Sequence, residues 1–427
     1  MKRSSWLLGA ALALGLVGTS WWALLRAPLD DAVLAEAAAP RAAPTPGATA
    51  SLVARGAYLA RAGNCQGCHT PRGAAPYSGG RGIPTPFGTV TSPNLTPDAA
   101  TGIGAWSAAD FRRALHHGRS RDGRLLVPAC PYDNITRISL ADADALFAYL
   151  QSLPAVASPR QPHALRFPYG TQTALALWRA LYFRPGRFEA DANQSAEWNR
   201  GAYLVQGLGH CSACHAQRNA LGAPREPLAL AGGLMPQQNW VAPALAGQSA
   251  QPLAQWLHRG IGPDTALLGP MAEVVLHSTQ HLTPADLQAM AQYLQSLPAP
   301  APAPAARGAA EPATPGQLQR GARIYADRCA RCHGDDGRGR AGAYVPLAGN
   351  RAVLRDPPAN PVQVVLGGAF AATTAANPRP FGMPPFATEL DDDEVAAVLS
   401  YVRNAWGNRA AAVRPLDVQR WRGSARP

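Results

Sequence analysis

The chain has 427 residues, 47% of them apolar, and a formal net charge of +12. This length predicts two to four domains, and the apolar content is enough for several small hydrophobic cores. Lys2 is the only lysine, so nearly all of the positive charge comes from arginine. A basic surface can attract acidic partners or anionic lipid. No basic run is interleaved with aromatic residues, so we expect no nucleic-acid binding.

Residues 1–28 form a candidate export signal or membrane anchor. Lys2 and Arg3 precede a largely apolar run from Trp6 to Leu25, which as a helix would be about 30 Å long and could span a bilayer. Small residues between Ala35 and Ala39 could instead host a cleavage site. Both alternatives place the rest of the chain outside the cytoplasm. We expect a location at the cell inner membrane, on its periplasmic side.

Residues 29–50 are rich in alanine and proline and predict an extended tether rather than part of a core. The first domain is expected to begin immediately after them.

The pattern Cys-x-x-Cys-His occurs three times and uses six of the seven cysteines. Its members are Cys65, Cys68 and His69, then Cys211, Cys214 and His215, and finally Cys329, Cys332 and His333. This pattern is the attachment signature of c-type haem. Two thiols about one helical turn apart can each add to a vinyl group at one haem edge, and the following histidine can ligate the iron. The sequence therefore predicts three covalently bound haems.

Three other uses of these cysteines fit less well. A disulfide framework suits a small secreted domain rather than a long chain whose cysteines come in close pairs. A thioredoxin-like site needs one pair in a βαβ context. A zinc ribbon needs two pairs about fifteen to twenty residues apart, whereas these pairs begin at residues 65, 211 and 329.

Whole domains repeat around the three motifs. An Arg-Gly-Ala tripeptide precedes each motif, at residues 55–57, 200–202 and 320–322. An amphipathic helix is predicted at the end of each repeat, at residues 142–153, 286–297 and 394–406, with an acidic first turn and a tyrosine seven residues later: Tyr149, Tyr293 and Tyr401. Two crossing helices beside a haem are typical of small c-type cytochromes. We predict a mainly α fold with three tandem class I cytochrome c domains, at residues 51–154, 196–298 and 316–408, behind the N-terminal helix.

The joints are marked by proline and alanine. Residues 155–195 form an inter-domain segment, residues 299–315 a stiff linker and residues 409–427 a C-terminal tail. Within the first joint, residues 171–183 are apolar, aromatic and of helical length. This stretch is expected either to pack between domains or to contact a partner subunit or the membrane surface.

Methionine is the expected sixth iron ligand in two domains, where it would raise the reduction potential. Met271 and Met383 each stand about twenty residues before the tyrosine of the last helix, where a loop would pass over the haem. Met235 is a weaker rival in the second domain, and helical spacing assigns Met290 to the core of its helix.

The first domain contains no methionine. Cys130 stands at the matching place, between Ala129 and Pro131, and thiolate is a strong electron-donating haem ligand. The alternatives are a buried thiol with His116 or His117 as the ligand, or an open site.

Beyond the haem motifs, the chain resembles the three-haem cytochrome c subunits of membrane-associated bacterial dehydrogenases. The resemblance covers about residues 50–408 and is carried by residues 55–59, 94–98, 101–104, 269–271, 278–280, 382–386 and 401–408. Much of this family has methionine where this chain has Cys130. The resemblance implies a partner catalytic subunit that depends on molybdenum, a quinone cofactor or flavin.

We therefore expect an electron-transfer subunit that takes electrons from a partner dehydrogenase and passes them to membrane quinone or a terminal oxidase, with no substrate chemistry of its own. The alternatives are a haem enzyme, acting on a small sulfur species or peroxide at the first haem, and a stand-alone electron shuttle.

Mass spectrometry of the denatured, fully matured protein should show three haem additions, because thioether bonds survive denaturation. Two or fewer additions would contradict the assignment of all three motifs.

Overall fold

The computed structural model describes residues 46–235, 237–299 and 312–422. The predicted N-terminal anchor, most of the tether and residues 300–311 of the linker lie outside these ranges. The chain divides into two compact units. The first holds residues up to 59 and residues 69–188, and the second holds residues 60–68 and everything from residue 189 onward.

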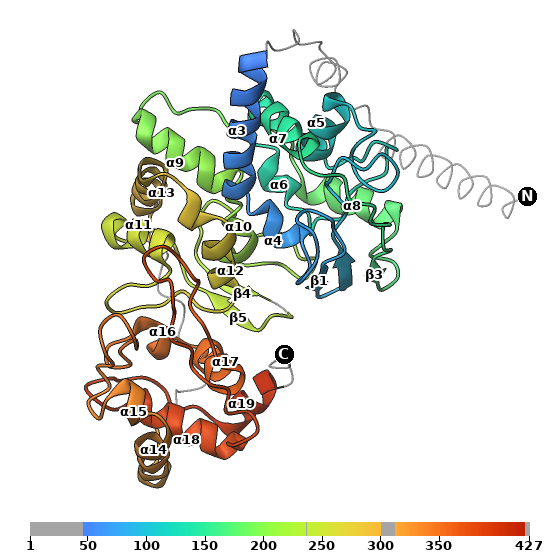
Figure 1. Cartoon of the computed structure of the whole chain (residues 1–427). Coiled ribbons are helices and arrows are strands. Elements are labelled where there is room, and N and C mark those ends of the chain that lie inside the picture. Colours follow the sequence, from blue (N-terminus) through green and yellow to red (C-terminus); the bar gives the residue numbers. More distant parts are fainter. Residues whose placement is uncertain (1–45, 236, 300–311, 423–427) are drawn as a thin grey trace, which may run out of the picture. The chain divides into compact units, whose positions relative to one another are not determined.

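The described chain is mainly helical, as the sequence predicts (Figure 1). Its helices are α3 (Pro46–Ala62), α4 (Cys65–His69), α5 (Ala108–His117), α6 (Tyr132–Ile135), α7 (Leu140–Gln151), α8 (Gln172–Tyr182), α9 (Ala196–Gln206), α10 (Ser212–His215), α11 (Ala250–Arg259), α12 (Pro270–His277), the 3-10 helix η1 (Thr279–His281), α13 (Pro284–Ser296), α14 (Pro315–Arg328), α15 (Ala330–His333), α16 (Arg351–Leu354), α17 (Ala359–Gly367), α18 (Asp392–Val402) and α19 (Pro415–Arg422).

Two small antiparallel sheets were not expected from the sequence. Strands β1 (Gly82–Thr85), β2 (Gly88–Thr91) and β3 (Ala164–Leu165) pair in that order in the first unit, and β4 (Gly233–Met235) pairs with β5 (Trp240–Ala242) in the second. These strands have two to four residues each, too few for an alternating apolar pattern to be visible in the sequence.

The last helix of each repeat begins about two residues before the predicted start, because a capping side chain fixes it there. Ser139, Thr283 and Asp391 each accept a hydrogen bond from the backbone N–H three residues later, which satisfies one of the open donors of the first turn. The last helix of the third repeat also ends earlier than predicted, at Val402, so Trp406 lies beyond it.

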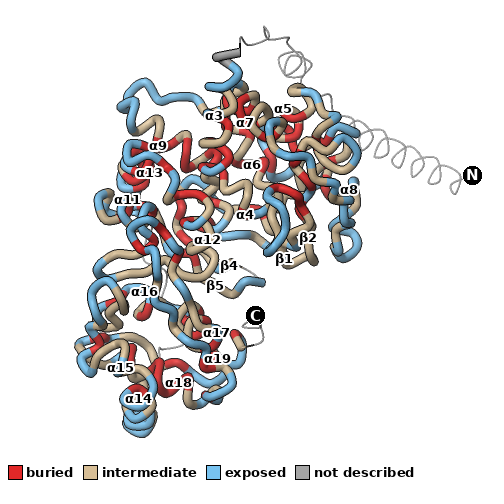
Figure 2. The backbone as a smooth tube through the Cα atoms, viewed as in Figure 1, coloured by how far each residue is buried: buried red, intermediate tan, exposed pale blue. Residues whose placement is uncertain are grey.

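The first and last helices of each repeat cross at a glycine. A Cβ atom added to Gly56, Gly201 or Gly321 would lie 1.9, 1.9 or 2.2 Å from the carbonyl oxygen of Ala145, Ala289 or Ala397, respectively. Only glycine allows the two backbones to approach this closely. Figure 2 shows buried residues concentrated along these crossing helices, for example α7 and α18.

In two repeats, an ion pair joins the crossing helices. Arg55 lies 2.6 Å from Asp142, and Arg200 lies 2.8 Å from Asp286. From the sequence, the only role expected for Asp142 and Asp286 is a favourable interaction with the helix dipole. The structure shows that each also pairs with an arginine on the crossing helix. In the third repeat, Glu394 instead forms a capping box with Asp391.

A buried arginine holds the end of α18 in the second unit. Arg403 is fully buried, and its guanidinium donates to the carbonyl oxygens of Val353, Arg355 and Ala411 and pairs with Asp356 at 2.5 Å. These acceptors compensate for the removal of its charge from water.

Within the described ranges, no helix combines the length and the apolar character needed to cross a membrane.

Replacing Gly321 with alanine should destabilise the second unit by about 1–3 kcal/mol, because the added methyl group would collide with the backbone of α18. Gly316→Ala in the same helix is the matched control. No atom lies within 4 Å of its added Cβ, so we expect no loss and a gain of at most about 1 kcal/mol. Urea unfolding followed by circular dichroism measures both, and equal behaviour of the two variants would contradict the crossing geometry.

Candidate haem attachment sites

Each Cys-x-x-Cys-His pentapeptide forms a single helical turn. The turns are α4, α10 and α15, and each ends at its histidine. None of the seven cysteines forms a disulfide. In all three copies, one turn of helix therefore carries two thiols followed directly by the histidine imidazole.

The three motif histidines have the same ring orientation. Nδ1 of His69 lies 2.8 Å from the carbonyl oxygen of Pro93, Nδ1 of His215 lies 2.7 Å from that of Pro243, and Nδ1 of His333 lies 3.1 Å from that of Val345. A carbonyl oxygen can only accept, so each Nδ1 carries the hydrogen and donates. The lone pair is then on Nε2, on the other side of the ring, which is the arrangement found in metal-ligating histidines.

Burial keeps these groups neutral. It lowers the pKa of His69, His215 and His333, and the hydrogen bond to the backbone carbonyl opposes this effect only in part. Neutral imidazole is the form that binds a metal.

The first thiol of a motif is also held neutral. Burial, and then the neighbouring motif cysteine, raise the pKa of Cys65 and of Cys211 to about 12. A thioredoxin-like dithiol needs a lowered thiol pKa instead. The donor set therefore fits a covalently bound c-type haem, which supplies a one-electron redox couple when bound.

The candidate sixth ligands of the first two repeats occupy equivalent positions. In the first repeat, the Leu126 N–H donates to the carbonyl oxygen of Gly118 at 2.8 Å, and in the second the Leu267 N–H donates to that of Gly260 at 2.8 Å. Each glycine caps the helix before it, α5 or α11, in a left-handed conformation. Cys130 and Met271 each follow the bonded leucine by four residues, so they stand at matching sequence positions after an equivalent backbone bond.

The local structure at Met271 differs from the expected loop. Gly269, with φ of +57°, and Pro270 begin helix α12, so Met271 lies in the first turn of a helix. Proline favours the first helical position because its missing N–H would have no partner there.

Met383 lies in an irregular segment, as expected. It forms an antiparallel bridge with Ala369, donating to and accepting from its backbone at 2.8 and 3.1 Å, and its half-buried side chain packs against the hydrophobic cluster of α17 and α18. Met290 is buried in α13, which agrees with its predicted core role, and Met235 ends strand β4.

The turn that carries Cys130 is supported by α8. The Tyr132 N–H donates to the carbonyl oxygen of Cys130 at 2.7 Å, and the Tyr132 ring is fully buried. Phe183 packs edge-on against this ring at 4.9 Å, and the Arg179 guanidinium lies 4.6 Å from the Phe183 ring and 5.3 Å from that of Tyr132. The stretch 171–183 therefore packs on the first unit, beside the loop of Cys130. Sequence analysis missed Arg179 because its partners are distant in the chain.

His116 and His117, the alternative ligands, are both buried at the end of α5. Nδ1 of His116 lies 2.9 Å from the carbonyl oxygen of Thr136. Nδ1 of His117 is buried without a hydrogen-bond partner among the described residues. Burial, followed by the charges of His116, Arg179 and Arg119, lowers the pKa of His117 to about 4, so it is neutral at physiological pH.

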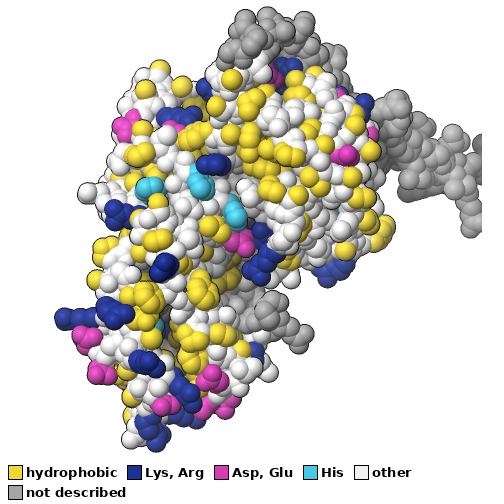
Figure 3. Space-filling model, in the orientation of Figure 1, with side chains coloured by type: hydrophobic (Ala, Val, Ile, Leu, Met, Phe, Trp, Pro, Cys, Tyr) yellow, Lys and Arg dark blue, Asp and Glu magenta, His cyan; other side chains and the backbone are white. Residues whose placement is uncertain are grey.

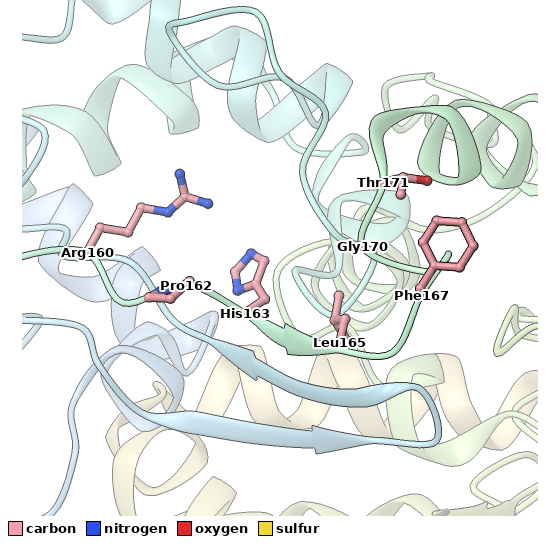
Figure 4. Close-up of a pocket in the computed structure, with 7 residues that line it drawn as sticks. All are labelled: Arg160, Pro162, His163, Leu165, Phe167, Gly170 and Thr171. Atoms are coloured by element: carbon pink, nitrogen blue, oxygen red, sulfur yellow. The ribbon is translucent and has the colours of Figure 1, made fainter.

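The first unit also has an open surface cavity of about 540 Å³ (Figure 4). The Thr91 N–H donates to Nδ1 of His163 at 3.2 Å, so this ring carries its hydrogen on Nε2. The cavity is lined by Arg160, Pro162, His163, Leu165, Phe167, Gly170 and Thr171. None of these residues belongs to an attachment pentapeptide or to a candidate ligand loop.

Sequence comparison with known proteins also points to cytochrome c. The family model for cytochrome c matches residues 53–154 and 318–406. The chain is 36% identical over 409 residues to the cytochrome c subunit of the quinone alcohol dehydrogenase of Komagataeibacter europaeus, covering 90% of this chain and 87% of that protein. It is 36% identical over 392 residues to the gluconate 2-dehydrogenase cytochrome c subunit of Pantoea cypripedii, covering 86% and 89%.

A third relative is longer. This nicotinate dehydrogenase subunit from Pseudomonas putida is 38% identical over 442 residues, and the alignment covers 99% of this chain but 35% of that protein. With the attachment turns, the oriented histidines and relatives aligned over most of its length, the chain belongs to the family of cytochrome c subunits of dehydrogenases.

Proposed function

We propose that this protein carries three covalent c-type haems in three tandem cytochrome c domains and transfers electrons within a dehydrogenase complex. The observation that supports this most strongly is the threefold recurrence of one geometry. Each attachment turn ends in a histidine whose Nδ1 is bonded to a backbone carbonyl, and each repeat has its helix crossing at a glycine.

The proposed electron donor is a dehydrogenase catalytic subunit, and the proposed acceptor is membrane quinone or a terminal oxidase. Relatives that align over most of this chain are cytochrome subunits of alcohol, gluconate and fructose dehydrogenases, and another belongs to a nicotinate dehydrogenase. Their names cover different kinds of substrate, so the donor is proposed here only as a class. Residues 1–28 would hold the complex at the inner membrane, on its periplasmic side.

The residues of this chain would set the three potentials. His69, His215 and His333 would ligate iron from one side, and Met271 and Met383 would ligate two of the irons from the other, raising their potentials. Cys130, at the position equivalent to Met271, would donate electron density to the first iron and give that haem the lowest potential of the three.

Purified holoprotein without a partner should accept electrons from dithionite and pass them to a short-chain ubiquinone analogue. It should not turn over hydrogen peroxide or thiosulfate beyond the rate of free haem. Visible absorption spectra follow the oxidation state of the haems in both assays. Sustained turnover of either small molecule by the isolated protein would instead favour a haem enzyme.

Replacing Cys130 with methionine should raise the potential of one haem and leave the other two nearly unchanged, because a thioether donates less electron density than a thiolate. Redox titration measures the potentials, and low-temperature electron paramagnetic resonance reports the ligand, since thiolate-ligated low-spin iron has a narrow spread of g values. Met290→Leu, in the core of α13, is the control and should change no potential. An unchanged spectrum in Cys130→Ala would show that Cys130 is only a partly buried thiol that does not ligate iron.

A further inference from the structure

Aromatic side chains are exposed on the third repeat of the chain. Phe370 is 66% exposed and Phe381 is 55% exposed, which is unusual for side chains of this size. The Phe381 ring lies 5.2 Å from the ring of Tyr344, in a tilted contact. We call Tyr344, Phe370 and Phe381 the aromatic patch.

The patch joins the two segments that flank the third attachment site. Tyr344 directly precedes Val345, whose carbonyl oxygen holds Nδ1 of His333. Phe381 stands two residues before Met383, and the Phe370 ring lies against the backbone of Gly382, where an added Cβ would be 2.1 Å from a ring carbon. The aromatic patch therefore connects the segment on the histidine side of the site with the segment that carries the candidate methionine ligand.

The surroundings of the patch are cationic. The Arg340 guanidinium lies 5.1 Å from the centre of the Tyr344 ring, and Arg379 is exposed two residues before Phe381. Neither arginine forms an ion pair with a described residue. Residues 337–386 contain five arginines and one acidic residue, Asp356, which is already paired with Arg403. Of the five, Arg338 pairs with Asp336 at 3.6 Å, just before this stretch. On the face shown in Figure 3, basic side chains lie next to hydrophobic ones over the C-terminal part of the second unit, with acidic side chains among them.

We propose that the aromatic patch, with Arg340 and Arg379 at its rim, is the docking surface for an electron-transfer protein whose contact face is apolar with an acidic rim. The proposal rests on the electron-transfer function proposed above. An apolar centre that loses its water on contact, surrounded by charges that steer the encounter, suits a fast and transient complex. One electron leaves this protein and reduces the partner by one electron, and no covalent bond forms or breaks.

A protein partner fits this surface better than a lipid bilayer does. Interfacial binding to lipid uses an amphipathic helix with a long apolar face and many basic residues opposite it. Here the three rings lie on irregular segments beside the residues that would ligate iron. The contact between Phe381 and Tyr344 and the packing of Phe370 against Gly382 hold the rings in place.

The test uses the full-length holoprotein on gold electrodes coated with a mixed monolayer of carboxylate-terminated and methyl-terminated alkanethiols. This surface imitates an acidic and apolar partner. Voltammetry measures the rate constant of electron exchange. In the double variant Arg340→Glu/Arg379→Glu, and separately in Phe381→Ser, we expect this rate constant to fall by about tenfold or more. The double variant Arg320→Glu/Arg323→Glu makes the same charge change at two exposed positions of α14. It is the matched control and should change the rate constant less than about twofold.

Haem content and visible spectra should stay unchanged in these variants, because none of the substituted residues ligates iron. Unchanged exchange rates in Arg340→Glu/Arg379→Glu would overturn the docking proposal while the electron-transfer function stands. Loss of binding to phosphatidylglycerol vesicles with unchanged exchange rates would assign the patch to lipid and also overturn it. If the wild-type protein fails to exchange electrons both with the monolayer and with a quinone analogue in solution, the proposed function is overturned as well.

Discussion

A hydrogen bond between a motif histidine and a backbone carbonyl is the interaction on which each attachment site depends. The carbonyl lies 24 residues after His69, 28 residues after His215 and 12 residues after His333, so the connecting segments differ greatly in length. The bond nevertheless forms in each case and fixes which ring nitrogen carries the hydrogen. Without it, the attachment turn would still present its thiols, but the ring could turn and Nε2 would have no fixed direction.

The crossing helices provide the rigid frame for these turns. The close approach at Gly56, Gly201 and Gly321 brings backbone against backbone, which leaves little freedom for the helices to slide. The first two repeats reinforce the crossing with an arginine–aspartate pair. In the third, the buried Arg403 instead fixes the end of α18 to Val353, Arg355 and Asp356, outside α14. The repeats thus share the requirement for glycine and differ in the polar contacts that stabilise the frame.

The repeats also differ around their candidate sixth ligands. Cys130 and Met271 occupy equivalent positions after the same backbone bond, whereas Met383 takes part in a strand-like bridge with Ala369. Within the second unit, the second and third repeats also contact each other directly. The side chain of Asn360 pairs with the backbone of Val241 on β5 through two hydrogen bonds of 2.7 and 2.9 Å, and the Thr374 hydroxyl donates to the carbonyl oxygen of Arg259. These bonds tie the segment that leads to Met383 to the preceding repeat.

The sequence alone was sufficient to identify the attachment pentapeptides, the helices before and after each of them, the helical stretch at residues 171–183 and the core position of Met290. These features depend on short-range spacing, which a linear pattern records directly. It did not reveal the carbonyl partners of the histidines, the reason for the three glycines, the support of the Cys130 turn by Arg179 and Tyr132, or the helical turn at Met271. Each of these is decided by residues that are distant in the chain or by the conformation of a single glycine, so only the tertiary structure brings the partners together.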